Sequence, residues 1–65
     1  MLKIRAVRKK KGWNQTVLAY RTGISIGDIS KIENGRMVPY PSQRKRLAKA
    51  LGIQPDELTM QVTDA

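Results

Sequence analysis

The side chains that could carry chemistry in this sequence are mainly cationic. Thirteen Lys and Arg stand against five Asp and Glu, which gives a formal net charge of +8 over 65 residues. Cys and His are both absent, which removes thiol chemistry, the commonest metal ligand and the commonest general base. With no nucleophile–base pair, metal-binding set or glycine-rich phosphate loop either, we expect neither an enzyme nor a bound cofactor. The charge favours a polyanionic partner, which at this point means DNA, RNA or an anionic membrane surface.

The charges are unevenly spread along the chain. Basic residues gather in the first eleven positions and again at residues 44–49, and three of the five acidic residues lie after residue 55. We expect the acidic end to face a protein partner rather than nucleic acid. No apolar run approaches the ~20 residues of a membrane-spanning helix, and charges interrupt the N-terminus where a signal peptide needs an apolar region. We therefore expect a cytoplasmic protein.

Capping residues and glycines divide the chain into short helices, which predicts an all-α fold. The expected helices are residues 2–10, 15–22, 26–33 and 41–51, with a brief fifth that begins at Pro55. Three residues suit helix starts: Asn14, Ser25 (with Asp28 as a capping-box partner) and Pro41. Glycines suited to helix ends follow each of the first four segments: Gly12, Gly23, Gly35 and Gly52. Residues 59–65 resemble a frayed tail.

The second and third helices are separated only by residues 23–25. Ala19 is small enough for the two helices to approach closely, and Gly23 permits a tight turn, as a helix-turn-helix requires. The inward-facing residues would be Leu18, Ala19, Ile24, Ile29 and Ile32. The same spacing also fits an ordinary helical hairpin in a small bundle.

The outward face of the third helix is narrow. With Ile29 and Ile32 inside, it presents short side chains and one long cation, Lys31, which suits a major groove about 12 Å wide. Gly27 costs about 1 kcal/mol relative to Ala inside a helix. It either allows close approach to a base edge or phosphate, or is simply tolerated in the first turn.

Taken in order, residues from about 2 to 58 resemble the lambdoid phage repressor and Cro-like helix-turn-helix family, also called the XRE family. The matching residues are Ile4, Val7, Arg8, Gly12, Gln15, Leu18, Ala19, Gly23, Ile29, Ile32, Glu33, Asn34, Gly35, Pro39, residues 47–52 and residues 55–58. The resemblance implies a compact five-helix bundle like that of lambda repressor, with its third helix in the major groove. It also implies a bacterial or phage-encoded protein associated with the nucleoid. It implies a DNA-binding domain at residues 1–58, followed by a tail at residues 59–65 that could contact a second protomer.

The resemblance also implies roles for individual residues. The residues that match base-reading positions, or brace them, are Gln15, Ile26, Gly27 and Lys31. The resemblance implies phosphate contacts for Asn14 and Asn34. Their positive charge leads us to expect phosphate contacts from four more residues: Arg36, Lys9, Lys10 and Lys11. Arg8 and Glu33 match a partly buried ion pair that joins the first helix to the end of the third.

Three departures from the family pattern affect these roles. Ile26 and Gly27 replace polar residues, so Ile26 would touch a thymine methyl and Lys31 would reach guanine O6 or N7. Phosphate contacts and DNA shape would then carry more of the specificity. Arg44 stands where an apolar residue is usual. Tyr40 stands at a helix cap, and either its hydroxyl reaches a phosphate or its ring covers the core.

These features predict a transcriptional regulator, a repressor, that binds a palindromic operator as a homodimer. Leu58, Met60 and Val62, expected to be exposed, either contribute to the dimer interface or belong to a disordered tail. One alternative is an antitoxin that also binds a protein partner, for which only residues 59–65 remain as a partner-binding segment. A second alternative is an RNA-binding or general nucleic-acid-binding protein.

Overall fold

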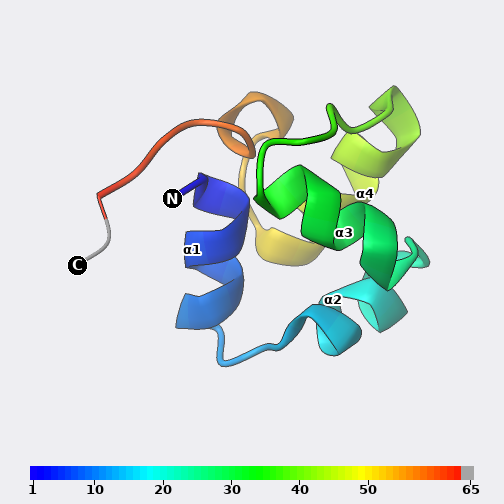
Figure 1. Ribbon diagram of the computed structural model, residues 1–65. Helices are drawn as coiled ribbons and strands as arrows, with labels where there is room; N and C mark the ends of the chain where they lie inside the picture. The colour runs from blue at the N-terminus through cyan, green and yellow to red at the C-terminus, as the bar shows by residue number, and fades with distance from the viewer. Residues whose placement is uncertain (64–65) are drawn as a thin grey trace.

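The computed structural model describes residues 1–63 and shows four α-helices followed by one 3₁₀ turn (Figure 1). Their bounds are α1 at Lys3–Lys10, α2 at Gln15–Thr22, α3 at Ile26–Glu33, α4 at Pro41–Leu51 and η1 at Pro55–Glu57. Within residues 1–63 the only β contact is an isolated bridge between Leu2 and Gln61. The all-α class is confirmed, and no described helix is long and apolar enough to cross a membrane.

The core is aliphatic, and every helix contributes to it. Residues with completely buried side chains are Ile4, Leu18, Ile29, Ile32, Leu47 and Leu58. α2 packs against both α3 and α4, while α1 packs against α4. Removing these side chains from water is the main force that holds such short helices together.

Local caps explain why α2 and α3 have the bounds that the sequence predicts. Asn14 Oδ1 accepts a hydrogen bond from the Val17 N–H at 2.8 Å, and Ser25 Oγ accepts one from the Asp28 N–H at 3.2 Å. Gly23 ends α2 in the left-handed conformation, with φ of +72°. Only half of the expected capping box forms at Ser25, because the Asp28 carboxylate accepts a hydrogen bond from Gln43 instead.

The prediction of a fifth α-helix is wrong, since η1 is a single turn of three residues. Pro55 starts it, and Glu57 Oε2 accepts a hydrogen bond from the Gln54 N–H at 2.9 Å. Immediately afterwards, the carbonyls of Leu58 and Met60 accept hydrogen bonds from the N–H groups of Ile4 and Lys3. Residues 58–60 cannot continue a helix and also offer these carbonyls to α1, so η1 ends after one turn.

The expectation of a frayed tail is also wrong for residues 60–62. α1 begins after Leu2, which offers no side-chain acceptor to the first N–H groups of the helix. The Met60 carbonyl accepts from the Lys3 N–H at 2.8 Å, and the Val62 N–H donates to the Met1 carbonyl at 2.9 Å. The C-terminal segment thus satisfies helix donors that otherwise have no partner in the protein. Residues 64 and 65 of the expected tail lie outside the described residues.

Burial corrects one further expectation and excludes one alternative. Leu58 was expected to be exposed, yet it is completely buried because η1 turns its side chain into the core. Tyr40 is 62% exposed, so its ring does not cover the core. Arg44 is half-buried on α4.

Candidate nucleic-acid interface

The turn between α2 and α3 is stabilised by its own polar groups. The Thr22 hydroxyl donates to the Leu18 carbonyl at 2.8 Å and accepts from the Ile24 N–H at 3.3 Å. The Gly23 N–H donates a hydrogen bond to the Ala19 carbonyl at 2.8 Å, and the Ile24 side chain is buried. The two helices therefore have a defined relative orientation, which a surface that reads DNA needs.

A buried ionic network holds the end of α3. Arg8 Nε donates to Glu33 Oε2 at 2.7 Å, and Arg8 Nη2 donates to Glu33 Oε1 at 2.9 Å. Both side chains are nearly inaccessible, at 8% and 1% of their full exposure. Arg8 Nη1 also donates to the Trp13 carbonyl at 2.7 Å. The fork geometry satisfies both charges at once, which a buried pair requires to be tolerated.

Gln15 joins this network from the first turn of α2. Its Nε2 donates to Glu33 Oε1 at 3.2 Å, and its side chain remains partly accessible. Glu33 thus connects α1, the start of α2 and the end of α3. The geometry suits the bracing role that the family resemblance implies for Gln15, while a direct contact between Gln15 and a base remains a prediction.

The face of α3 that points away from the core carries the expected base-reading residues. Ile29 and Ile32 are completely buried, whereas Ile26 is 48% exposed and both Gly27 and Lys31 are exposed. A Cβ built on Gly27 would meet nothing within 4 Å, and Gly27 is not among the glycines with positive φ. The fold therefore does not explain why this position is a glycine.

The expected phosphate-contacting residues lie in separate places. Asn14 is exposed at the cap of α2. Asn34 and Arg36 are exposed just beyond the end of α3, and Lys9 and Lys10 are exposed on the last turn of α1.

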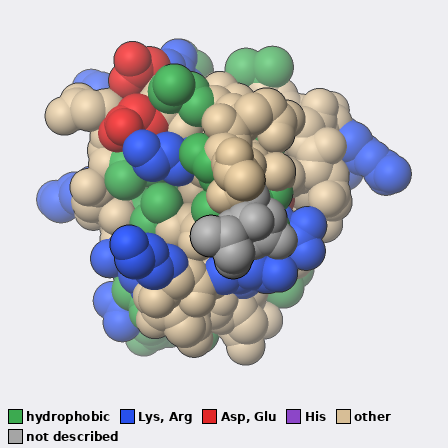
Figure 2. Space-filling view, turned by 90° about the vertical axis from the view of Figure 1, so that its left-hand side faces the viewer, with side chains coloured by type: hydrophobic (Ala, Val, Ile, Leu, Met, Phe, Trp, Pro, Cys, Tyr) green, Lys and Arg blue, Asp and Glu red, His purple; other side chains and the backbone are tan. Residues whose placement is uncertain are grey.

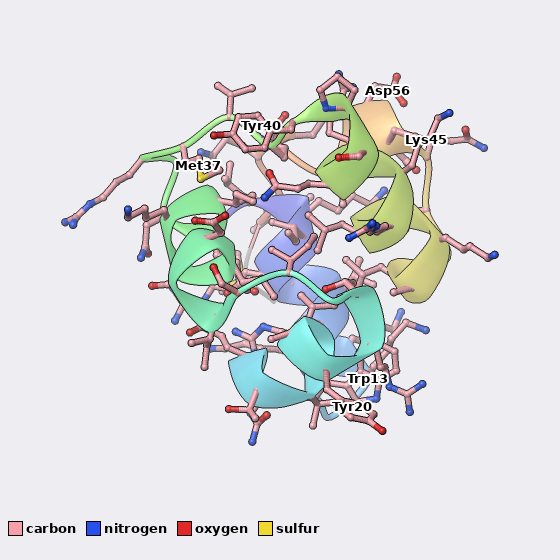
Figure 3. All side chains as sticks on the ribbon, turned by 90° about the vertical axis from the view of Figure 1, so that its right-hand side faces the viewer. Trp13, Tyr20, Met37, Tyr40, Lys45 and Asp56 are labelled. Carbon is pink, nitrogen blue, oxygen red and sulfur yellow. The ribbon has the colours of Figure 1, made fainter. Side chains whose placement is uncertain are left out.

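Lys11 has a different environment from these five. Its Nζ lies 5.3 Å from the centroid of the Trp13 ring, over which Arg21 also lies, at 4.4 Å. Figure 3 shows Trp13 and Tyr20 together beside α2, far from Met37 and Tyr40 on the connection between α3 and α4. Lys11 and Arg21 therefore share one aromatic partner, the Trp13 ring.

One residue that orients α3 was missed from the sequence. Gln43 is buried, its Nε2 donates to Asp28 Oδ2 at 3.1 Å, and its Oε1 accepts from the Tyr40 N–H at 2.9 Å. It connects the start of α4 to the first turn of α3. A signal was present, because Gln at the third position after a helix cap is the second half of a capping box.

Charge is spread widely around the molecule. Figure 2, which views α1 and the C-terminal segment, shows Lys and Arg at the left and right edges and on the face between them, with acidic side chains at the upper left. Lys3 Nζ lies 2.7 Å from Glu57 Oε1. This hydrogen bond, together with one from the Gln54 N–H, lowers the pKa of Glu57 below its ordinary value of 4.5.

Comparisons with known proteins agree with this geometry. A family model described as a helix-turn-helix domain matches residues 3–63. The HTH-type transcriptional repressor RghR of Bacillus subtilis is 45% identical over 51 residues, which are 77% of this chain and 38% of RghR. YazB, an uncharacterized HTH-type transcriptional regulator of the same species, is 39% identical over 56 residues, or 86% of this chain and 81% of YazB.

An uncharacterized HTH-type transcriptional regulator of Mycobacterium tuberculosis is 35% identical over 52 residues, or 80% of this chain and 20% of that protein. The chain thus spans well under half of the length of two of these three relatives. No solved structure gives a significant match. The family match covers nearly the whole chain and agrees with the resemblance found in the sequence, so the chain belongs to the XRE-type helix-turn-helix family.

Proposed function

We propose that this protein binds a specific operator in double-stranded DNA and represses transcription. The observation that carries the proposal is α3 itself. It buries Ile29 and Ile32 and leaves Ile26, Gly27 and Lys31 on its open face. A rigid, exposed helix of this width fits the major groove of B-DNA.

Each expected base-reading or bracing residue has a distinct task in this proposal. Lys31 donates to O6 or N7 of a guanine, and Ile26 packs on a thymine methyl. Gly27 allows the backbone of α3 to approach the DNA closely. The Gln15 Nε2 group donates to Glu33, and in this proposal the amide oxygen of Gln15 is directed towards the DNA.

Contacts to phosphates position the helix. Asn14 lies at the start of α2, while Asn34 and Arg36 follow the end of α3, so these residues flank the helix-turn-helix along the chain. Lys9 and Lys10 add positive charge from the end of α1. If one protomer neutralises about four phosphates, log affinity should fall with log salt concentration at a slope of about −4. An affinity independent of salt would contradict this role.

The proposal includes a homodimer on a palindromic site. Two copies of α3 would then enter successive major grooves about 34 Å apart. Of the three residues expected there, Leu58 is buried and Val62 is half-buried rather than exposed. Met60 is 54% exposed, and Val38 and Tyr40 are 81% and 62% exposed. Val38→Ser and Met60→Ser should each weaken the dimer, so analytical ultracentrifugation should give a higher dimer dissociation constant and a larger monomer fraction. An unchanged monomer fraction in both variants would remove these residues from the interface.

The antitoxin alternative loses its main support in the structure. It requires residues 59–65 as a free segment that binds a partner. The backbone of residues 60–62 instead pairs with residues 1–3. We therefore retain operator binding alone.

Selection of bound sequences from a random duplex pool tests the proposal. We expect an enriched palindrome with two half-sites whose centres are about one helical turn apart, 10–10.5 base pairs. The enriched duplex should then outcompete random duplex and RNA of the same length. Equal affinity for all three would contradict specific operator binding.

A further inference from the structure

A second cationic surface lies between α2 and α4. It is an open cavity of about 530 Å³ lined by Arg21, Thr22, Arg46, Lys49 and Ala50. Three of these five residues are cations, and all three are exposed. We refer to this cavity as the α2–α4 groove.

No carboxylate lines the groove to balance these charges. Within residues 1–63, the two ion pairs join Lys3 to Glu57 and Arg8 to Glu33, both outside the groove. The Asp28 carboxylate accepts from Gln43, which is also outside it. Three cations around one cavity repel one another, so a bound anion would relieve the repulsion and gain attraction from each of them.

Two of the cations lie close to groups of α2 or of the loop before it. The guanidinium carbon of Arg21 lies 4.4 Å from the centroid of the Trp13 ring, a cation–π geometry that restrains the side chain. Arg46 Nη1 lies 3.8 Å from where a Cβ would stand on Gly23, so its guanidinium reaches across to the end of α2. Guanidinium groups bind phosphate oxygens through pairs of parallel hydrogen bonds. Two of them at one cavity suit a ligand with several phosphate oxygens.

α3 contributes no residue to the lining of the α2–α4 groove. α2 contacts both α3 and α4, and Figure 3 shows α3 on the left and α4 on the right, with α2 below both. A duplex seated on α3 would then leave the groove free. The ligand of the groove is therefore separate from the operator.

The lining also limits the size and polarity of the ligand. The cavity volume falls within the range of about 300–1,000 Å³ that is usual for small-molecule sites. Apolar lining is limited to Ala50 and the aliphatic stems of the long side chains. A ligand therefore gains binding energy chiefly from its charges. We propose that the α2–α4 groove binds a small molecule that carries two or more phosphate groups.

Inorganic triphosphate is a suitable probe, titrated into the full chain at constant ionic strength and followed by calorimetry. We expect saturable binding with one site per protomer. Arg46→Gln and Lys49→Gln should each weaken it by about tenfold or more, because each removes a charged hydrogen bond. Lys45→Gln is the matched control, since it removes the same charge from α4 one residue before Arg46 and outside the lining.

The comparison between variants decides the outcome. Binding that does not saturate, or that weakens equally in all three variants, would overturn the proposal by assigning the effect to net charge alone. A lower melting temperature for Arg46→Gln with unchanged triphosphate affinity would overturn it too, because it would leave Arg46 a purely structural role.

Displacement of the probe by a stoichiometric amount of random duplex would also overturn the proposal, because it would place the groove within the DNA-binding surface. Operator affinity should be the same for Arg46→Gln and Lys45→Gln. Operator affinity is a separate measurement, so a failure of the groove proposal would leave operator binding untouched.

Discussion

Glu33→Ala should strongly lower the free energy of unfolding of this protein. The substitution removes two hydrogen bonds from Arg8, at 2.7 and 2.9 Å, and one from Gln15 at 3.2 Å. Arg8, nearly inaccessible to water, then keeps only the Trp13 carbonyl as a partner. Removing one partner of a buried ion pair costs about 3–5 kcal/mol.

This loss is large for a chain of 65 residues. A domain of this size has a total free energy of unfolding of about 3–10 kcal/mol. Each 1 kcal/mol lowers the melting temperature by about 4–8 °C, so the variant should melt at least about 12 °C below wild type in a circular dichroism scan. Glu57→Ala is the control, because its ion pair with Lys3 is about one-third accessible, and its effect should be much smaller.

A double variant separates the charge pair from packing. Arg8→Met with Glu33→Leu replaces both charges by apolar side chains, so the pair no longer leaves one buried charge unpaired. It should melt above Glu33→Ala. Two results would refute the reasoning. One is a Glu33→Ala variant with the same melting temperature as Glu57→Ala. The other is a double variant whose loss of stability equals or exceeds the summed losses of Arg8→Met and Glu33→Leu.

Three further predictions concern the helix ends and the open face of α3. Gly27→Ala should raise the free energy of unfolding by up to about 1 kcal/mol, since a Cβ meets nothing there, while operator affinity falls; unchanged affinity would mean that glycine is merely tolerated. Truncation after Leu58 should cost about 1–3 kcal/mol for its lost backbone hydrogen bonds, and the Lys3 N–H, now bonded to Met60, should lose protection from hydrogen exchange; retained protection would contradict the pairing. The pKa of Glu57 is lowered below 4.5 by Lys3, so its stabilisation is present above that pH and is lost as pH falls through the folded pKa. Wild type should therefore lose more thermal stability than Glu57→Gln as acid is added, and parallel losses would refute this.

The sequence predicts best what is decided locally. Asn14 and Gly23 mark the ends of α2 because a helix terminus needs a nearby acceptor or a left-handed residue. The bounds of α3 and α4 follow from Ser25, Pro41 and Gly52 for similar reasons. Cap signals of this kind depend on a few neighbouring residues and are visible in the sequence.

Contacts between distant residues were harder to predict. Leu58 is buried because η1 turns its side chain into the core. The Met60 carbonyl accepts from the Lys3 N–H, where α1 lacks a side-chain cap, and nothing near Met60 in the sequence indicates that pairing. Gln43 reaches Asp28 across fifteen positions. The α2–α4 groove likewise depends on the packing of α2 against α4, which brings Arg21 and Arg46 to one cavity.

The placement of charge bears on how the operator is read. α3 carries one cation on its open face, Lys31, while most of the other cations lie on α1 and α4. A helix with so few polar groups makes few direct hydrogen bonds to bases. In our account phosphate contacts and DNA shape then supply a larger part of the specificity.

The central claim is that α3 reads base sequence, and Lys31→Ala tests it most directly. The measurement is the affinity of wild type, Lys31→Ala and Lys45→Ala for the selected operator and for every single-base variant of one half-site. We predict that Lys31→Ala loses about 1–3 kcal/mol and the preference for guanine at one position per half-site, while Lys45→Ala keeps every preference. A uniform loss of affinity across all sequences in Lys31→Ala, with its base preferences intact, would contradict the account.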